Sequence, residues 1–240
     1  LIVTFNDMIS RLEQSFEKQK QFVSDASHEL RTPISVIQGY VNLIDRWGKS
    51  DTEVLEESIS SIKYETEHMA NLIKQLLFLA RTDNKTQTAQ LKPENISIIA
   101  EDVVREATVM DSKITIKFTG DNSVIANIDE HLIKQLMWIF VDNAIKYSAD
   151  KPIIINVNTG YENEKPFFTV ADKGIGMEQE NINHIFDRFY RADQSRNKEI
   201  DGNGLGLSIA KWIIEQHNGH IDVVSEIGKG SCFKITFPKL

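Results

Sequence analysis

A row of apolar residues at heptad spacing runs through the first part of the chain and constrains its fold more than any other feature. The d positions of this heptad are largely apolar, and the a positions are all apolar: Ile2, Ile9, Phe16, Val23, Leu30, Ile37 and Ile44. A spacing of three and four residues kept over this length is typical of a coiled-coil or helix-bundle seam. The sequence therefore predicts one long helix with its seam along one face.

A turn and a second long helix are predicted next. Gly48 suits a helix C-terminus, and Ser50 with Glu53 three residues later predicts a capping box for the following helix. From Leu55 to Ala80, largely apolar residues again recur at steps of four and three. The two helices would form an antiparallel hairpin, which buries little apolar surface by itself. We therefore expect two copies to pair as a homodimer through a four-helix bundle.

The stretch FVSDASHELRTP places a histidine on the outer face of the first predicted helix. With Val23 at a and Ala26 at d, His28 falls at f, the position that faces away from the seam. Pro33 removes one backbone donor, and we expect the helix to bend close to His28 for that reason. An outward histidine alone is most often an ordinary solvated residue.

Composition narrows the classes of protein. The chain has 240 residues with 41% hydrophobic and 26% charged residues, as soluble globular proteins have, and its net charge of -8 argues against a nucleic-acid partner. The single cysteine, Cys232, cannot form an internal disulfide. No apolar run approaches the roughly 18 residues that span a bilayer, and the pattern of the first residues does not predict a signal peptide. Because the chain begins at Leu1 rather than Met, we expect it to be part of a longer protein.

The second half of the chain mixes helical and strand-like segments. Residues 83–95 are polar without helical periodicity and predict a linker. Beyond it we expect helices at 98–111, 130–147 and 207–217, and strands at 114–118, 124–128, 153–158, 167–171, 220–224 and 232–237. Helices and strands in this order predict an α+β sandwich, in which helices cover one face of a mixed sheet.

Two glycine-rich stretches flank a basic segment in this half. DKGIGM (172–177) follows a predicted strand, and GNGLGL (202–207) opens a predicted helix. A glycine-rich turn into a helix presents free backbone N–H groups and the positive end of the helix dipole to an anion, most often a phosphate. The segment between them has the irregular composition of a mobile lid after Tyr190. It carries counter-charges for a polyphosphate at Arg188, Arg191, Arg196 and Lys198.

A third stretch, FVDNAIKYS, lies on the predicted helix 130–147. Asn143 and Lys146 are three residues apart and share one helix face, which places an amide oxygen near an ammonium group. Mg²⁺ takes few protein ligands and keeps waters and substrate phosphates, so one asparagine is sufficient in principle. These features together predict a site for a magnesium–nucleotide complex.

The order and spacing of five motifs resemble those of the sensor histidine kinases of bacterial two-component systems. FVSDASHELRTP resembles their phosphoacceptor box and FVDNAIKYS their asparagine box. DKGIGM resembles the first glycine box, IFDRFYRAD the phenylalanine box and DGNGLGLSIA the second glycine box. The resemblance covers nearly the whole chain. It implies a dimeric helical bundle followed by an α+β ATP-binding domain of the gyrase, Hsp90 and histidine-kinase type.

The resemblance also implies a division of the chain and a place in the cell. Residues 1–20 resemble the end of a HAMP signalling helix, which normally follows a transmembrane segment. Residues 21–84 would be the dimerisation and histidine phosphotransfer hairpin, and residues 85–240 the catalytic ATP-binding domain. The chain would then be the cytoplasmic portion of a membrane sensor, which contacts the membrane only through segments that precede it.

For the reaction, the resemblance implies autophosphorylation with ATP and transfer of the phosphoryl group to an aspartate in the receiver domain of a response regulator. His28 would be the nucleophile, and Glu29 would accept or orient its proton. Thr32 matches the residue that positions a water in phosphatase turnover of that regulator, an activity that stays open. Arg191 matches the lid arginine that contacts the γ-phosphate.

In the ATP-binding domain, the resemblance assigns Mg²⁺ to Asn143. Asp172 would accept a hydrogen bond from the adenine amino group. The other residues that would contact the nucleotide are Lys146, Tyr147, Gly174, Gly176, Arg188, Gly204, Leu205, Gly206 and Leu207.

The match to the family has two departures. The asparagine box usually begins with an asparagine four residues before Asn143, and this chain has Ile139 there. Secondary contacts to magnesium or its waters are therefore in doubt, and we expect activity below that typical of the family. The second departure, Asn203 in place of the usual threonine, is milder.

Two alternatives from other classes stay open. A nucleotide hydrolase of the gyrase or Hsp90 kind would turn over ATP without using His28. A dimeric signalling scaffold would bind a receiver domain and transfer nothing, an alternative that Ile139 supports.

Overall fold

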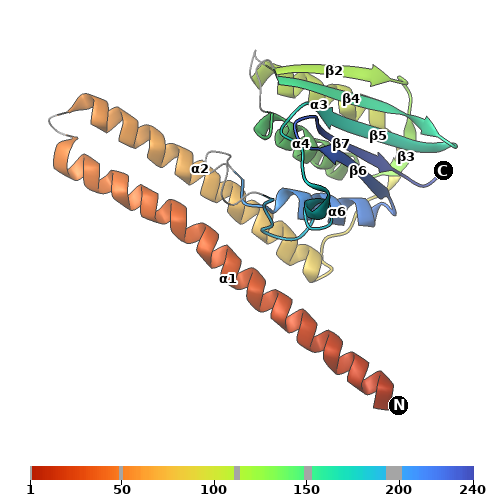
Figure 1. The fold of residues 1–240 in the computed structure, drawn as a ribbon, viewed down its shortest axis with the longest axis horizontal. Coiled ribbons are helices and arrows are strands. Elements are labelled where there is room, and N and C mark those ends of the chain that lie inside the picture. The colour runs from red at the N-terminus through yellow and green to blue at the C-terminus, as the bar shows by residue number, and fades with distance from the viewer. Residues whose placement is uncertain (1, 49–50, 111–113, 149–152, 193–201) are drawn as a thin grey trace. The chain divides into compact units, whose positions relative to one another are not determined.

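The computed structural model describes residues 2–48, 51–110, 114–148, 153–192 and 202–240. They form two compact units, Leu1–Phe78 and Leu79–Leu240. The first unit consists of α1 (Ile2–Trp47) and most of α2 (Thr52–Asp83), which run antiparallel to each other (Figure 1). The heptad pattern therefore predicted two long helices correctly, and α1 continues through Pro33 without interruption.

The turn between the two helices differs in detail from the prediction. Gly48 follows the last residue of α1, and its N–H donates to the Ile44 carbonyl at 2.9 Å. Ser50, the predicted cap, lies outside the described residues. Asp51 supplies the capping hydrogen bonds, because its Oδ1 accepts from the N–H groups of Glu53 at 3.0 Å and Val54 at 3.2 Å. An aspartate fills the N-cap role as well as a serine.

Many large apolar side chains of the hairpin remain exposed in a single chain. Phe16 is 67% exposed and Val23 58%, although both are a positions of the heptad. Ile34, Val41, Ile59 and Ile73 are exposed as well. An exposed apolar surface of this extent is typical of an interaction site. Among the described residues, no helix combines the length and the apolar character needed to cross a membrane.

The second unit is built on two sheets. Its elements in chain order after α2 are β1 (Lys92–Asn95), α3 (Ile96–Met110), β2 (Ile114–Gly120), β3 (Ile125–Ile128), α4 (Glu130–Lys146), β4 (Ile153–Glu162), β5 (Lys165–Asp172), α5 (Gln179–Ile182), α6 (Gly206–Gln216), β6 (His220–Glu226) and β7 (Gly230–Thr236). The larger sheet has the strand order β2-β4-β5-β7-β6, in which only β2 and β4 pair in parallel. β1 and β3 form a separate antiparallel pair.

One face of the larger sheet is covered by helices, as Figure 1 shows for α3, α4 and α6. Burial alternates along the strands in agreement with this arrangement: Ile153, Ile155 and Val157 of β4 are buried, and the residues between them are less so. Phe140 of α4 stacks on Phe233 of β7 with ring centroids 4.8 Å apart. The predicted α+β sandwich, with helices on one face of a mixed sheet, is confirmed.

The predicted linker was wrong at its C-terminal end. Residues Lys92–Asn95 form β1 and pair with β3 from Lys92↔Ile128 to Asn95↔Ile125. The sequence KPEN does not alternate between apolar and polar residues, and its Pro93 argues against a strand. Pairing with β3 alone, in a two-stranded ladder, leaves one side of β1 without a partner strand, where a proline is tolerated.

A buried histidine joins the start of α4 to the end of α6. His217 is 2% exposed; its Nδ1 donates to the Ile213 carbonyl at 2.6 Å, and its Nε2 accepts from the N–H of Asp129 at 3.0 Å. Asp129 caps α4 through Leu132 N–H at 3.1 Å, and its other oxygen accepts from Gln90 N–H at 2.9 Å. Because Nε2 must accept, the imidazole is neutral in this arrangement.

We predict that this histidine makes the stability of the second unit depend on pH. Burial lowers the pKa of His217 below its ordinary value of 6.5, so between the two values the unfolded chain binds more protons than the folded one. The stabilisation is complete above pH 6.5 and falls as the pH drops from there toward the lowered folded value. The free energy of unfolding is measured at each pH with urea in a Trp47→Phe background. The fluorescence of Trp138 and Trp212 then reports unfolding.

In this experiment His217→Gln should flatten the fall in unfolding free energy between about pH 7.5 and about pH 5.5. His220→Gln is the matched control, because the His220 side chain is 76% exposed. A profile for His217→Gln parallel to that of the unmodified chain would show that another group causes the dependence.

Candidate functional site

A pocket of about 560 Å³ lies in the second unit, where α4 and α6 meet the loops at one end of the sheet. α4 contributes Asn143 and Tyr147, and α6 contributes Leu207. The other residues that line it are Asp172, Ile175, Gly176, Met177, Glu178, Asn181, Ile185, Tyr190, Arg191, Ala192, Ile227, Ser231 and Phe233. The pocket thus brings together residues from FVDNAIKYS, DKGIGM and GNGLGL, the three motifs that the sequence singled out in this unit. It also includes residues from the basic segment between the two glycine stretches.

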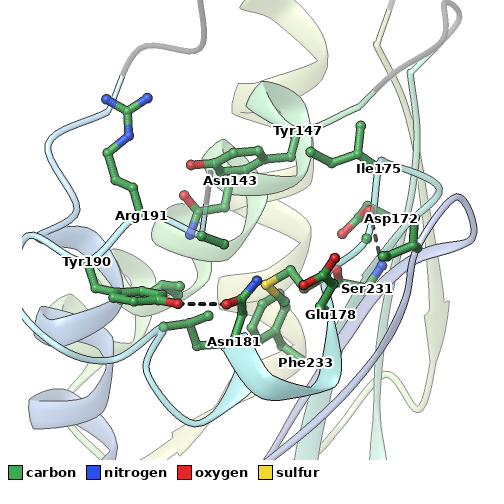
Figure 2. A pocket seen from close by; sticks show the side chains of 16 residues that line it. Asn143, Tyr147, Asp172, Ile175, Glu178, Asn181, Tyr190, Arg191, Ser231 and Phe233 are labelled. Atoms are coloured by element: carbon green, nitrogen blue, oxygen red, sulfur yellow. Dashed lines mark hydrogen bonds between the residues drawn. The ribbon is translucent and has the colours of Figure 1, made fainter. Parts of the chain in front are cut away.

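One end of the pocket has a carboxylate beside apolar side chains. Asp172 ends β5, and its Oδ1 accepts from the N–H of Gly174 at 2.7 Å and from that of Ser231 at 3.2 Å. Burial raises the pKa of the Asp172 carboxyl above its ordinary value, and these two hydrogen bonds oppose the rise. Because both donors approach Oδ1, Oδ2 is the oxygen that could accept from a ligand. Ile175 and the ring of Phe233 add apolar surface to the pocket (Figure 2).

The other end of the pocket is polar and cationic. In Figure 2 the side chains of Asn143 and Arg191 lie across the pocket from Asp172, with the Tyr147 ring beside Asn143. An amide oxygen can bind a hard cation, and a guanidinium group can bind phosphate oxygens. The pocket therefore has an acceptor and apolar walls for a planar heterocycle at one end and groups for charged phosphates at the other.

The first glycine stretch is shaped by close packing against α4. A Cβ added to Gly174 would lie 2.3 Å from the Tyr147 carbonyl oxygen, a distance that no side chain tolerates. The same carbonyl accepts from the N–H of Ile175 at 3.0 Å. Gly174 is thus required by contact with the protein itself, and it is not one of the residues that line the pocket. Gly176 lines the pocket, as expected of a residue beside a bound ring.

Several predicted residues shape the pocket without lining it. Leu205, within the second glycine stretch, is fully buried, and Gly206 begins α6. Gly204 has φ +67°, and its carbonyl accepts from the N–H of Phe189 at 3.0 Å. Lys146 pairs with Asp142 on the same helix at 2.6 Å, and Arg188 pairs with Asp83 at 2.7 Å. The two cations therefore point to carboxylates of the protein in this structure.

The two departures from the family pattern have local explanations. A Cβ on Gly206 would lie 3.5 Å from Cγ2 of Ile139, so Ile139 lies against the first turn of α6. An apolar side chain suits this contact. The side-chain oxygen of Asn203 accepts from the N–H of Leu205 at 3.3 Å and thereby supports the turn that leads into α6.

Other pocket residues had no signal in the sequence. Ser231 and Phe233 come from β7, and Asn181 comes from the short helix α5. The Tyr190 hydroxyl donates to Oδ1 of Asn181 at 2.8 Å across one wall (Figure 2). The segment GSCF contains a small polar residue near the start of a strand, which is too common a pattern to indicate a site.

The predicted nucleophile lies in the first unit. His28 is exposed on α1, as position f of the heptad requires. Thr32, one helical turn later, is exposed as well, and Glu29 is half-buried. The imidazole is therefore open to a reactant from solvent, with a hydroxyl on the same helix face.

Comparison with protein families assigns both units. Residues 18–85 match the His Kinase A (phospho-acceptor) domain. Residues 128–240 match the histidine kinase-, DNA gyrase B-, and HSP90-like ATPase family. The chain is 43% identical over 235 residues to the sensor histidine kinase YkoH of Bacillus subtilis (strain 168), covering 98% of this chain and 51% of YkoH. The chain thus spans about half the length of this relative.

Solved structures share the fold. A structure of histidine kinase ThkA in complex with response regulator protein TrrA matches 95% of this chain and 64% of that chain, with a TM-score of 0.74 and 21% identity. Full-length ShkA in complex with AMPPNP matches 91% of this chain and 45% of that chain, with a TM-score of 0.65 and 23% identity. These likenesses establish the fold of the two units.

Proposed function

The chain belongs to the sensor histidine kinases of two-component systems, and we propose that it transfers the γ-phosphoryl group of ATP to His28 and then to an aspartate of a response regulator. The observation that carries this proposal is the two-ended pocket, with Asp172 at one end and Asn143 and Arg191 at the other. A histidine in the phosphoacceptor box, exposed on α1, supplies the nucleophile that such a pocket would serve.

ATP fits the polarity of the pocket. The adenine amino group would donate to Oδ2 of Asp172, while the ring lies among Ile175, Met177 and Phe233. The triphosphate would extend toward Arg191, whose guanidinium group can pair with the γ-phosphate oxygens. Tyr147 and Leu207 would flank the middle of the nucleotide, and Lys146 would turn from Asp142 to a phosphate when one is present.

Asn143 fits the needs of Mg²⁺ on the nucleotide. Its side chain lines the pocket at the phosphate end, and Mg²⁺ prefers oxygen ligands with several positions left to water and phosphate. The bound ion would neutralise charge on the phosphates. Ile139 does not add an oxygen ligand, so we expect this chain to bind the ion through fewer protein contacts than relatives with an asparagine there.

The chemistry at His28 is a direct displacement. One imidazole nitrogen would form a bond to the γ-phosphorus while the bond from that phosphorus to the β–γ bridging oxygen breaks, and ADP leaves. The ring proton would pass to the Glu29 carboxylate. A neutral imidazole is a competent nucleophile near neutral pH. Thr32 would position a water that hydrolyses the aspartyl phosphate of the regulator, a separate phosphatase reaction.

Two partners are part of the proposal. The exposed apolar row on α1 and α2, which includes Phe16 and Val23, supports a homodimer through a four-helix bundle. The second partner is the receiver domain of a response regulator, in keeping with the ThkA–TrrA complex.

We also propose that residues 1–20 continue a HAMP-like signalling helix, that 21–84 form the phosphotransfer hairpin and that 85–240 form the catalytic domain. The whole protein would then be a membrane sensor whose cytoplasmic portion includes this chain.

The test is incubation of the chain with γ-labelled ATP and Mg²⁺, followed by treatment with acid and with alkali. We expect label that survives alkali and is lost in acid, because a phosphorus–nitrogen bond hydrolyses in acid. Nucleotide binding without label would favour a scaffold that transfers nothing. Steady release of labelled phosphate without label on the protein would favour a hydrolase of the gyrase or Hsp90 kind.

A further inference from the structure

An ion pair joins two distant parts of the chain within the second unit, which begins at Leu79. Asp83 is the last residue of α2, and Arg188 follows 105 residues later. The guanidinium group donates from Nη2 to Oδ1 of Asp83 at 2.7 Å and from Nη1 to Oδ2 at 2.9 Å. Two parallel hydrogen bonds between planar groups fix direction as well as distance.

This pair differs from an ordinary surface pair. Asp102 and Arg105, for comparison, lie three residues apart on α3, where neighbouring side chains of one helix meet whatever the tertiary structure. Asp83 and Arg188 meet only because of the tertiary fold. The Arg188 side chain is 33% exposed and the Asp83 side chain 53%, so solvent screens the pair in part, and its two parallel hydrogen bonds set it apart more than its burial does.

The residues that follow Arg188 lead directly into the pocket. Phe189 has φ +60°, a conformation that a bulky residue adopts only when its surroundings impose it. Its N–H donates to the Gly204 carbonyl at 3.0 Å, and a Cβ on Gly204 would lie 2.7 Å from the Phe189 carbonyl carbon. Tyr190 and Arg191 come next and line the pocket. The direction of these two side chains therefore depends on how the strained turn at Phe189 is held.

We propose that Asp83 is a positioning residue for the phosphate end of the pocket. It holds Arg188 on one side of the strained turn, while Gly204 holds the turn from the other side. Together these contacts direct Arg191 toward the γ-phosphate and Tyr190 toward Asn181. The inference rests on the proposed nucleotide site and adds to it a residue that no motif of the sequence contains.

Binding measured with the full chain tests this role. In calorimetric titrations, Asp83→Asn should weaken the affinity for ATP with Mg²⁺ about five-fold and leave the affinity for adenosine within about two-fold. The difference arises because adenosine does not reach Arg191. Exchanging the charges, Asp83→Arg with Arg188→Asp, should recover much of the ATP affinity that each single change removes. Asp102→Asn is the matched control and should change neither affinity.

A second measurement needs no nucleotide. Amide hydrogen exchange at Phe189 should be faster in Asp83→Asn than in the unmodified chain, because the N–H bond to Gly204 opens more often. An unchanged exchange rate, or an equal loss of affinity for ATP and adenosine, would overturn the positioning role. If the unmodified chain bound neither ligand, the proposed nucleotide site would be wrong, and hydrogen exchange would still decide whether Asp83 holds the turn.

Discussion

Asp172→Asn is expected to weaken ATP binding by about 100-fold while it raises the melting temperature of the empty protein. Asparagine is nearly the same size, and its side-chain oxygen can keep the hydrogen bonds from the N–H groups of Gly174 and Ser231. The second oxygen becomes an NH₂ group, which would point a donor at the amino group of adenine. The adenine amino group would then be buried without an acceptor, and leaving a buried donor without a partner lowers the affinity strongly.

The gain in stability follows from the raised pKa of Asp172. Burial disfavours its charged form, so the group contributes stability that is complete below the unfolded value of 3.8 and is lost as the pH rises through the folded pKa. At neutral pH the ionised carboxylate therefore destabilises the empty fold, and an uncharged amide removes that cost. The two melting temperatures should converge as the solution is acidified below the folded pKa.

Calorimetric titration with ATP and thermal melting without it measure these effects. Asp222→Asn is the control, because Asp222 lies on β6 with its side chain 57% exposed. If Asp172→Asn bound ATP as tightly as the unmodified chain, adenine would not be recognised at this carboxylate. A lower melting temperature would mean that the carboxylate stabilises the fold in a way that the amide cannot replace.

His28→Ala is expected to abolish acid-labile labelling from γ-labelled ATP and to leave ATP affinity unchanged. The imidazole of His28 is exposed on α1, and a neutral imidazole nitrogen is a far better nucleophile near neutral pH than a guanidinium group that stays protonated. Loss of the attacking nitrogen removes the reaction itself, so the effect is complete. His131→Ala serves as the control, because that residue is exposed in the first turn of α4.

Label that persists in His28→Ala would place the phosphoryl group on another residue.

Mixed dimers extend the experiment. The His28→Ala chain keeps an intact nucleotide site but lacks the nucleophile, and the Asp172→Asn chain keeps the nucleophile but lacks the acceptor for adenine. When His28→Ala chains are mixed with Asp172→Asn chains, label returns if a catalytic domain phosphorylates the histidine of its partner. Labelling confined to unmodified dimers would mean that each domain serves its own chain.

The sequence predicted the parts of the structure that depend on local pattern. Heptad spacing located α1 and α2, and it correctly assigned His28 to an exposed face of α1. Motif spacing singled out Asn143 and Asp172, which the fold brings to one pocket although they lie on different elements. These predictions succeeded because helical periodicity and strand-to-turn boundaries are set by neighbours in sequence.

What the sequence could not predict depends on tertiary contacts. Ser231 reaches Asp172 because β7 pairs with β5, a register that no local pattern specifies. The bond between Asp83 and Arg188 spans 105 residues, and neither residue differs in type from solvated neighbours. β1 is a strand only because β3 offers it a partner. Gly174 was predicted for a different reason from the one the structure gives, since its constraint comes from the Tyr147 carbonyl.

The strand order has an evolutionary consequence. β5 ends at Asp172, β6 starts at His220, and β5 pairs not with β6 but with β7, so the connection between β5 and β6 leaves the sheet and returns to its far edge. Doubling the length of such a connection costs only about 0.6 kcal/mol in closure entropy. A change in the length of this connection therefore need not shift strand register. The elements that bear Asn143 and Asp172, α4 and β5, would therefore keep their places when this connection changes length.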